Sequence, residues 1–267
     1  MTYKMLVLDL DDTLLTDDHK ISPRNKDLLI KAQEKGIYVV LASGRPTQAM
    51  MQFAKELELQ RFGSFIISYN GAIITDLSNG KAIFEQSLTA EQIHDLHDFS
   101  LANRLHILTY QNGSIVSETE SEYIDIEKHL TGMPHQKVGC FKDAVAQPAV
   151  KCILLEHPEL LKKMETKLKE DNPSLSIAIS KPFFLEVMSK GIDKAASIDR
   201  LAKRLGIIPK EIIAVGNAHN DLSMIQYAGL GIWVDNVAPD IRHFADVIVG
   251  SNNHHGVAEV VERFILN

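Results

Sequence analysis

Four short polar clusters carry side chains that could do chemistry: carboxylates, a hydroxyl group, a lysine and amides. They are Asp9-Leu10-Asp11-Asp12-Thr13-Leu14, Ser43-Gly44-Arg45-Pro46, Ser189-Lys190-Gly191-Ile192-Asp193-Lys194 and Gly216-Asn217-Ala218-His219-Asn220-Asp221. Residues two apart in extended backbone face the same way, so Asp9 and Asp11 share one side. Acids this close repel one another unless a cation lies among them, and Mg²⁺ prefers oxygen ligands. One carboxylate could then attack phosphorus while the other handles protons.

Each cluster also has an ordinary structural interpretation. The acids from Asp9 to Asp12 could form a solvated loop or cap a helix. Ser43 and the N–H groups that follow it suit an anionic phosphate, but a serine before a helix is also a common N-cap. Lys194 is unfavourable against the dipole at a predicted helix start, which hints at a function, although a solvated lysine is common. The turn after Gly216 offers oxygen donors, or simply a polar turn with an N-cap.

The elements around these clusters predict one site. Apolar runs at residues 5–8, 37–42, 65–68 and 212–215 indicate buried strands, and helices open at Ser22-Pro23, Pro46 and Asp193. Strands that alternate with helices indicate right-handed βαβ units and a parallel sheet. Ligands bind at the carboxyl ends of such strands, so the four clusters should converge on one edge.

The middle of the chain has a different pattern. A hairpin around Ser78-Asn79-Gly80, a capping box that begins at Thr89 and several adjacent short strands indicate an α+β region with few crossovers. We therefore predict an α/β, Rossmann-like core formed by residues 1–82 and 189–267. Residues 83–188 would form an inserted α+β domain.

The composition narrows the classes of function. The chain has 267 residues, is 45% hydrophobic and carries a formal net charge of −7, without a local run of lysine and arginine. Such a chain is a poor general binder of nucleic acid. No apolar run has the length of a membrane span, and Asp9 interrupts the first one. Cys140 and Cys152 are expected to be free thiols in a reducing compartment, so we expect a cytoplasmic protein.

The four clusters, in this order, resemble the motifs of the haloacid dehalogenase (HAD) superfamily of phosphohydrolases. The details resemble its Cof-type branch, whose large α+β cap follows the third core strand. Tyr69-Asn70-Gly71-Ala72, and Ser251-Asn252-Asn253 followed by Gly256-Val257-Ala258, are also similar to that branch. The resemblance covers essentially the whole chain. It implies a phosphatase that acts through an aspartyl-phosphate intermediate, with a cap that closes over the core and selects the leaving group.

The resemblance also implies residue roles. Asp9 would be the nucleophile, Asp11 the general acid and then the base, Ser43 a hydrogen-bond donor to the phosphoryl group, and Lys194 its counter-charge. Phosphate would also contact positions that are neither nucleophile nor acid, namely Leu10, Gly44, Arg45 and Asn220. Mg²⁺ would be held by Asp9, the backbone carbonyl of Asp11 and residue 217. Asp221 would hold either Lys194 or a water molecule bound to the metal.

Two departures from the family pattern stand out. Asn217 replaces the aspartate that the family places there, which removes one negative charge and predicts weaker Mg²⁺ binding. Trp233-Val234-Asp235-Asn236 replaces a small glycine-containing turn. The resemblance implies a small phosphorylated metabolite as the substrate, such as a sugar phosphate, pyridoxal phosphate or flavin mononucleotide.

Other functions remain open at this point. A phosphate-ligand-binding protein with little turnover would explain Asn217. A phosphate-accepting receiver domain uses similar residues in a much shorter chain, and a phosphomutase would retain a bisphosphorylated intermediate. The oligomeric state is not predicted. Among the histidines, His94 and His97 are interpreted as a surface pair, His254 and His255 as solvated, and His219 as a residue that touches either substrate or solvent.

Overall fold

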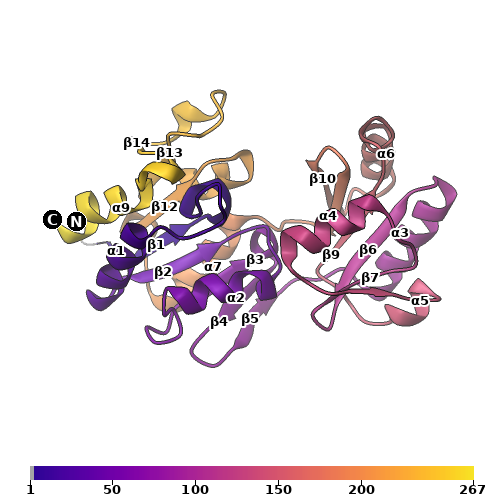
Figure 1. The fold of residues 1–267 in the computed structure, drawn as a ribbon, viewed down its shortest axis with the longest axis horizontal. Helices are drawn as coiled ribbons and strands as arrows, with labels where there is room; N and C mark the ends of the chain where they lie inside the picture. The colour runs from indigo at the N-terminus through magenta and orange to yellow at the C-terminus, as the bar shows by residue number, and fades with distance from the viewer. Residues whose placement is uncertain (1–2) are drawn as a thin grey trace. The chain divides into compact units, whose positions relative to one another are not determined.

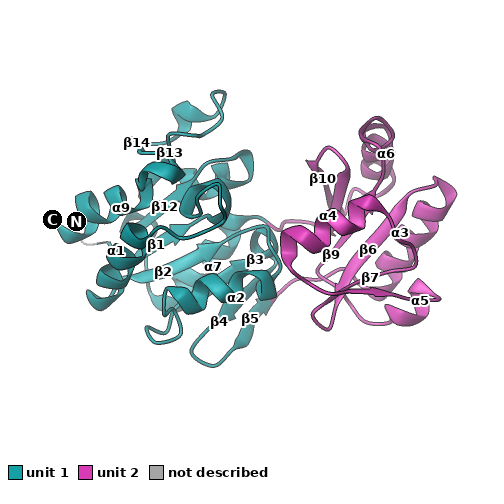
Figure 2. Cartoon of the chain, in the orientation of Figure 1, with its two compact units in different colours: residues 1–84, 193–267 teal, residues 85–192 magenta. Residues whose placement is uncertain are grey.

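The chain forms two compact units, which Figure 2 colours separately. The computed structural model describes residues 3–267. Unit 1 comprises residues up to Phe84 together with Asp193–Asn267, and unit 2 comprises Glu85–Ile192. Unit 1 is thus built from two distant stretches of the sequence, while unit 2 is one continuous insertion. No helix within the described residues is both long and apolar enough to cross a bilayer.

Unit 1 is built on an eight-stranded sheet in the order β14-β13-β12-β1-β2-β3-β4-β5. Its strands are β1 (Met5–Leu8), β2 (Tyr38–Ala42), β3 (Phe65–Ser68), β4 (Ile73–Asp76), β5 (Lys81–Glu85), β12 (Ile212–Gly216), β13 (Leu230–Val234) and β14 (Val247–Val249). The pairs from β14 across to β3 are parallel, and β3 pairs with β4 antiparallel. The predicted α/β fold with a parallel core sheet is confirmed.

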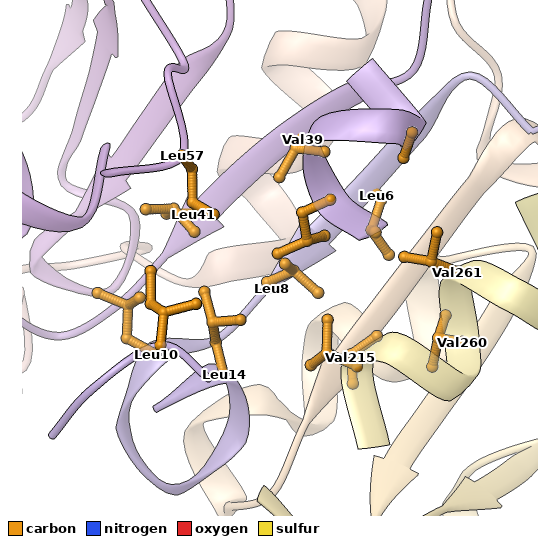
Figure 3. Close-up of a cluster of buried hydrophobic side chains, with 14 of the residues drawn as sticks. Leu6, Leu8, Leu10, Leu14, Val39, Leu41, Leu57, Val215, Val260 and Val261 are labelled. Atoms are coloured by element: carbon orange, nitrogen blue, oxygen red, sulfur yellow. The ribbon is translucent and has the colours of Figure 1, made fainter. Parts of the chain in front are cut away.

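Helices cover both faces of this sheet (Figure 1). They are α1 (Pro23–Glu34), α2 (Thr47–Glu56), α7 (Lys194–Leu205), α8 (Leu222–Tyr227) and α9 (Gly256–Val261). Alternate residues of β1 enter two separate cores, Leu6 and Leu8 on one face and Met5 and Val7 on the other. Figure 3 shows the first core, which includes Leu6, Leu8, Val39, Leu41, Val215, Val260 and Val261. A strand buried on both faces is what the continuous apolar run predicted.

Local signals in the sequence set the helix ends. The Ser22 side chain accepts a hydrogen bond from the Asn25 N–H at 3.2 Å, and Pro23 opens α1. The helix ends before Gly36, whose φ of +85° lies in the left-handed region that favours glycine. Asp193 caps α7 through a 2.8 Å bond from the Ala196 N–H, and this cap fixes where Lys194 begins the helix.

Unit 2 contains a six-stranded, mostly antiparallel sheet in the order β10-β11-β9-β6-β7-β8. Its strands are β6 (His106–Gln111), β7 (Ser114–Ser117), β8 (His135–Lys137), β9 (Lys151–Leu155), β10 (Leu175–Lys181) and β11 (Phe184–Ser189). Its helices are α3 (Ala90–Ala102), α4 (Glu122–Thr131), α5 (Phe141–Ala144) and α6 (Pro158–Asp171). Side chains from α3, α5 and α6 and from one sheet face form its main apolar core. The α+β pattern expected for this region is present.

Candidate active site

Three of the four clusters lie where parallel strands end. Asp9 follows β1, Ser43 follows β2, and Gly216 is the last residue of β12. Because β1 pairs with β2 on one side and with β12 on the other, these strand ends are neighbours at one edge of the sheet. The Asp9 N–H donates to the Val215 carbonyl at 3.0 Å, which fixes the backbone where the nucleophile candidate leaves the sheet. This is the convergence that the topology predicted.

Lys194 brings the third cluster into the same site. Its side chain is fully buried, and its Nζ donates to Asp9 Oδ1 at 2.7 Å and to Asp221 Oδ1 at 2.6 Å. One ammonium thus joins carboxylates from the ends of β1 and β12. A lysine buried between two acids differs from the solvated residue that its sequence context alone suggested.

Burial and neighbouring charge shift the pKa values of this pair. Burial raises the pKa of Asp9 to about 7, and the Asp221 carboxylate adds to the increase against the opposing effect of Lys194. Burial lowers the pKa of Lys194, but the carboxylates of Asp221 and Asp9 outweigh it, so the net pKa is raised. Lys194 therefore stays charged, and the group of acids still has more negative charge than one lysine neutralises.

Gly216 allows Asp221 to reach its place. A Cβ at Gly216 would lie 2.6 Å from the Asp221 Cβ, so any larger residue would displace this carboxylate. Asp221 Oδ2 accepts hydrogen bonds from the N–H groups of Asn217 and Ala218, both at 3.1 Å. With Lys194 on the other oxygen, Asp221 is fully engaged and buried, which suits a residue that orients Lys194.

Arg45 contacts Asp11 in a bidentate ion pair. Its Nη2 lies 2.6 Å from Asp11 Oδ1, and its Nε lies 2.9 Å from Asp11 Oδ2. The Arg45 side chain is 15% exposed and that of Asp11 is 43% exposed, so the acid lies toward solvent and the arginine lies against the protein. Ser43 is buried, and its Oγ accepts a 3.1 Å bond from the Arg45 N–H. The second cluster is thereby joined to the first.

The remaining predicted phosphate-binding residues lie around this edge. Asn220 Nδ2 donates to Asn70 Oδ1 at 3.2 Å, and a Cβ at Gly44 would lie 3.1 Å from the same Asn70 amide. Asn70 therefore links the second cluster to the last one. The Leu10 side chain is buried and apolar, so a phosphate contact there would come from its main-chain N–H.

Gly71 connects this edge to the start of α7. Its φ is +112°, and a Cβ there would lie 2.4 Å from the Asp193 carbonyl oxygen. Its own carbonyl accepts a 2.5 Å bond from Ser197 Oγ. The close approach that only glycine permits holds the first turn of α7, and hence Lys194, against the end of β3.

The oxygen atoms at this edge are of the types that Mg²⁺ prefers as ligands. Among the described residues, no three side chains of His, Cys, Asp and Glu group as metal ligands. The oxygens that belong to the predicted set are instead the Asp9 carboxylate, the Asp11 main-chain carbonyl and the Asn217 amide oxygen. Thr13 Oγ1 donates to Asn217 Oδ1 at 3.1 Å, which turns that amide oxygen toward the Asp9–Leu14 turn. One carboxylate among neutral oxygens matches the way Mg²⁺ binds when it keeps several waters.

The histidines need one correction. His97 is not on the surface, because it lies on the inward face of α3, 6% exposed, where its ring stacks on Phe141 with ring centroids 5.0 Å apart. Its Nε2 lies 3.2 Å from Glu118, so the prediction of a solvated surface pair was wrong. His219 is 65% exposed and lies 2.7 Å from Asp240. His255 lies 2.9 Å from Ser22 Oγ.

Sequence reasoning missed several residues that support this edge. Thr13 is fully buried and holds Asn217, although its position in the first motif gave no sign of that contact. Asn236 and Asn252 bind the turn that follows Asp9. Both lie in segments that the sequence marked as distinctive. They lie more than two hundred residues after this turn in the sequence, and only the fold brings them into contact with it.

Comparisons with known proteins agree with this geometry. The family model of haloacid dehalogenase-like hydrolases matches residues 6–261. A solved haloacid dehalogenase-like hydrolase from Bacteroides thetaiotaomicron is 38% identical, with a TM-score of 0.94 over 98% of this chain and 99% of that one. Two Bacillus subtilis proteins are similar over nearly their whole length. They are 5-amino-6-(5-phospho-D-ribitylamino)uracil phosphatase YcsE (28% identical; 98% of this chain, 96% of that protein) and Phosphatase YwpJ (27%; 98% and 100%). The predicted resemblance is confirmed: the chain belongs to the haloacid dehalogenase-like hydrolases and is a phosphatase.

Proposed function

We propose that this phosphatase hydrolyses a small phosphomonoester in two displacements, with Asp9 as the nucleophile and a phosphorylated Asp9 between them. The observation that carries the proposal is the buried Asp9–Lys194–Asp221 group at the carboxyl edge of the sheet. Lys194 occupies one oxygen of Asp9 at 2.7 Å, so the other oxygen is the one that attacks phosphorus. The charge of Lys194, fixed by Asp221, stabilises the phosphoryl oxygens as negative charge develops on them.

Asp11 serves both halves of the reaction. It protonates the leaving alkoxide in the first displacement and takes a proton from water in the second. Because both oxygens of Asp11 accept from Arg45, the acid has to leave this arginine and take up a proton before the first step. Ser43 and the main-chain N–H groups of the turn after Asp9 donate to the phosphoryl oxygens.

Asp9, the Asp11 carbonyl and Asn217 are the residues that would hold Mg²⁺. When bound, Mg²⁺ would offset the negative charge of the phosphoryl oxygens and of the carboxylates beside it. Burial, with the Asp221 carboxylate adding to its effect, raises the pKa of Asp9 to about 7, and a cation beside Asp9 would stabilise its charged form. The neutral amide of Asn217 leaves Asp9 as the one carboxylate in this set.

The substrate class follows from the reaction and from the relatives. Sugar phosphates, pyridoxal phosphate and flavin mononucleotide are candidates that present one phosphomonoester. YcsE is named for a ribityl phosphate, 5-amino-6-(5-phospho-D-ribitylamino)uracil, so this compound joins them. All are small anions, whose phosphate group could be held by Lys194, main-chain N–H groups and a bound cation.

The test measures phosphate release from this panel, with and without Mg²⁺, for the native chain and Asp9→Asn. We expect the substitution to lower kcat by on the order of a thousandfold or more, because it removes the attacking oxygen. Acid-quenched native protein should carry a phosphoryl group on the peptide that contains Asp9. Asp171→Asn, which changes an exposed acid at the end of α6, is the matched control and should keep native activity.

A catalytically weakened phosphatase that mainly binds a phosphorylated ligand is the second candidate, and Asn217 is the residue that favours it. It predicts tight binding of a phosphorylated ligand and very slow phosphate release from every panel member at low or high Mg²⁺. Turnover that survives Asp9→Asn would instead show that another group is the nucleophile.

A further inference from the structure

Two asparagines far along the chain from the first motif hold the turn that carries Asp11. After Asp9, the chain turns through residues 10–14, and the Leu15 N–H closes the turn with a 2.9 Å bond to the Leu10 carbonyl. Asp12 has φ of +56°, a left-handed conformation that most residues with a Cβ avoid and that aspartate adopts more readily than most. A turn of this kind needs contacts from outside to keep one conformation.

Asn236, in the loop after β13, makes the contact next to Asp11. Its Nδ2 donates to the Asp12 carbonyl at 2.7 Å, across 224 residues of sequence. Its Oδ1 accepts a 3.1 Å bond from the Asn252 N–H. The Asp12 carbonyl can only accept and the N–H can only donate, so one amide orientation alone serves both partners.

Asn252 extends this clamp to the segment that follows the turn. It is 2% exposed, and its Nδ2 donates to the Leu15 carbonyl at 3.1 Å and to Asp17 Oδ1 at 3.0 Å. Both partners are acceptors, so this amide also has one workable orientation. Together the two side chains bind the turn at Asp12, Leu15 and Asp17.

We infer that Asn236 and Asn252 are positioning residues for Asp11. They fix the backbone on the far side of Asp11, while Asp9 is fixed on the near side by its bond to Val215. The inference rests on the proposed role of Asp11 as the proton donor to the leaving group. Without the clamp the turn relaxes from its left-handed conformation, and Asp11 no longer points at the leaving oxygen.

The experiment compares two leaving groups in Asn236→Ala. The alkoxide released from an alkyl phosphate needs a proton from Asp11, whereas the p-nitrophenolate released from p-nitrophenyl phosphate is a stable anion and does not. Because Asp11 also acts as the base in the second displacement, the first displacement is followed alone, as release of the alcohol or phenol in a single turnover. We expect its rate to fall about tenfold for the alkyl phosphate, with little change for the aryl phosphate. Asn236 is exposed, so the substitution should leave the fold intact. Equal losses for both substrates would overturn the inference.

A double-mutant cycle separates this inference from the proposed function. If Asn236 acts through Asp11, Asn236→Ala should cause no further loss in an Asp11→Asn background. Additive losses overturn the positioning role while leaving Asp11 as the acid. If Asp11→Asn itself shows no selective loss on alkyl phosphates in the first displacement, the proposed role of Asp11 as the acid fails, and the inference fails with it.

Asn25→Ala provides the matched control. Asn25 is a buried asparagine of unit 1 whose Oδ1 accepts a 3.0 Å bond from the Ala258 N–H, between α1 and α9. Its loss should lower the stability of the fold but leave the ratio of alkyl to aryl activity unchanged. A shift in that ratio would show that any weakening of unit 1 mimics the expected effect, and the positioning role would be rejected.

Discussion

Each unit of the molecule buries a lysine among acids, but in different structural settings. In unit 1, Lys194 contacts Asp9 and Asp221 at 2.7 and 2.6 Å. In unit 2, Lys151 is 3% exposed and lies 3.0 Å from Glu186, while the buried Glu127 accepts a hydrogen bond from the Tyr110 hydroxyl. The two clusters contain the same types of residue, so residue type does not show which cluster takes part in catalysis.

The position of the charges within the elements distinguishes them. Lys151 and Glu186 lie within the paired strands β9 and β11, where they are diagonal neighbours across the antiparallel ladder. The backbone groups beside them are used by the sheet. Asp9 and Asp221 lie beyond the ends of parallel strands, where turns leave N–H groups and oxygens available for a ligand. Buried charge therefore indicates a functional site here only where it coincides with strand ends.

Removing each lysine gives the largest expected contrast. Lys194→Met should lower kcat for phosphate release by about a thousandfold, because it removes the fixed charge that faces the phosphoryl group. It should also destabilise unit 1 by about 3–5 kcal/mol, since Asp9 and Asp221 stay buried without a counter-charge. Lys151→Met should lower stability too, but leave kcat per folded molecule unchanged. Urea unfolding and phosphate release check both, and an equal loss of kcat in both variants would contradict the distinction.

Adding charge to the metal set should give a smaller effect. Asn217→Asp should raise the affinity for Mg²⁺ about tenfold, because a second carboxylate joins that of Asp9. Calorimetric titration of Mg²⁺ into the substrate-free protein measures this directly. Asn103→Asp, at the end of α3 in unit 2, controls for the added charge. Unchanged affinity in Asn217→Asp would remove residue 217 from the predicted ligands.

The smallest expected effect is the pH dependence of unit 2. Burial raises the pKa of Glu127 above its ordinary 4.5, against the opposing effects of Lys151 and the Tyr110 hydroxyl. The folded protein then holds this proton more tightly than the unfolded chain does. Stability should fall as pH rises from about 4.5 through the raised folded pKa. Glu127→Gln should flatten this part of the profile in urea unfolding at a series of pH values, and a profile as steep as the native one would assign the slope to other groups.

Much of the sheet in unit 1 was predictable because its strands are short apolar runs buried on both faces. Met5–Leu8 and Phe65–Ser68 have the predicted bounds. In unit 2, the capping box predicted at Thr89 is present, with hydrogen bonds in both directions between Thr89 and Gln92. The strand β8 was missed, because His-Gln-Lys carries no apolar pattern and its place comes only from parallel pairing with β7.

The contacts of single side chains were less predictable. A lysine at a helix start looks the same in sequence whether it is solvated or buried, so the partners of Lys194 emerge only when β1 and β12 are adjacent. The inward direction of His97 follows from its place on α3, beside the buried Ile93 and Leu96, but its polarity suggested the surface. The contacts of Asn236 and Asn252 depend on the path of two loops, which periodicity does not describe.

The division of unit 1 into two stretches also orders events during synthesis. The central strand β1 pairs with β12, so that Met5 lies beside Ile212, and Lys194 and Asp221 both come after the whole of unit 2. A ribosome releases Asp9 before unit 2 and its two partners only after unit 2. Until then the growing polypeptide holds an incomplete sheet with β1 unpaired on one side. The nascent protein therefore cannot assemble the proposed catalytic group of Asp9, Lys194 and Asp221 until the whole of unit 2 has been synthesised.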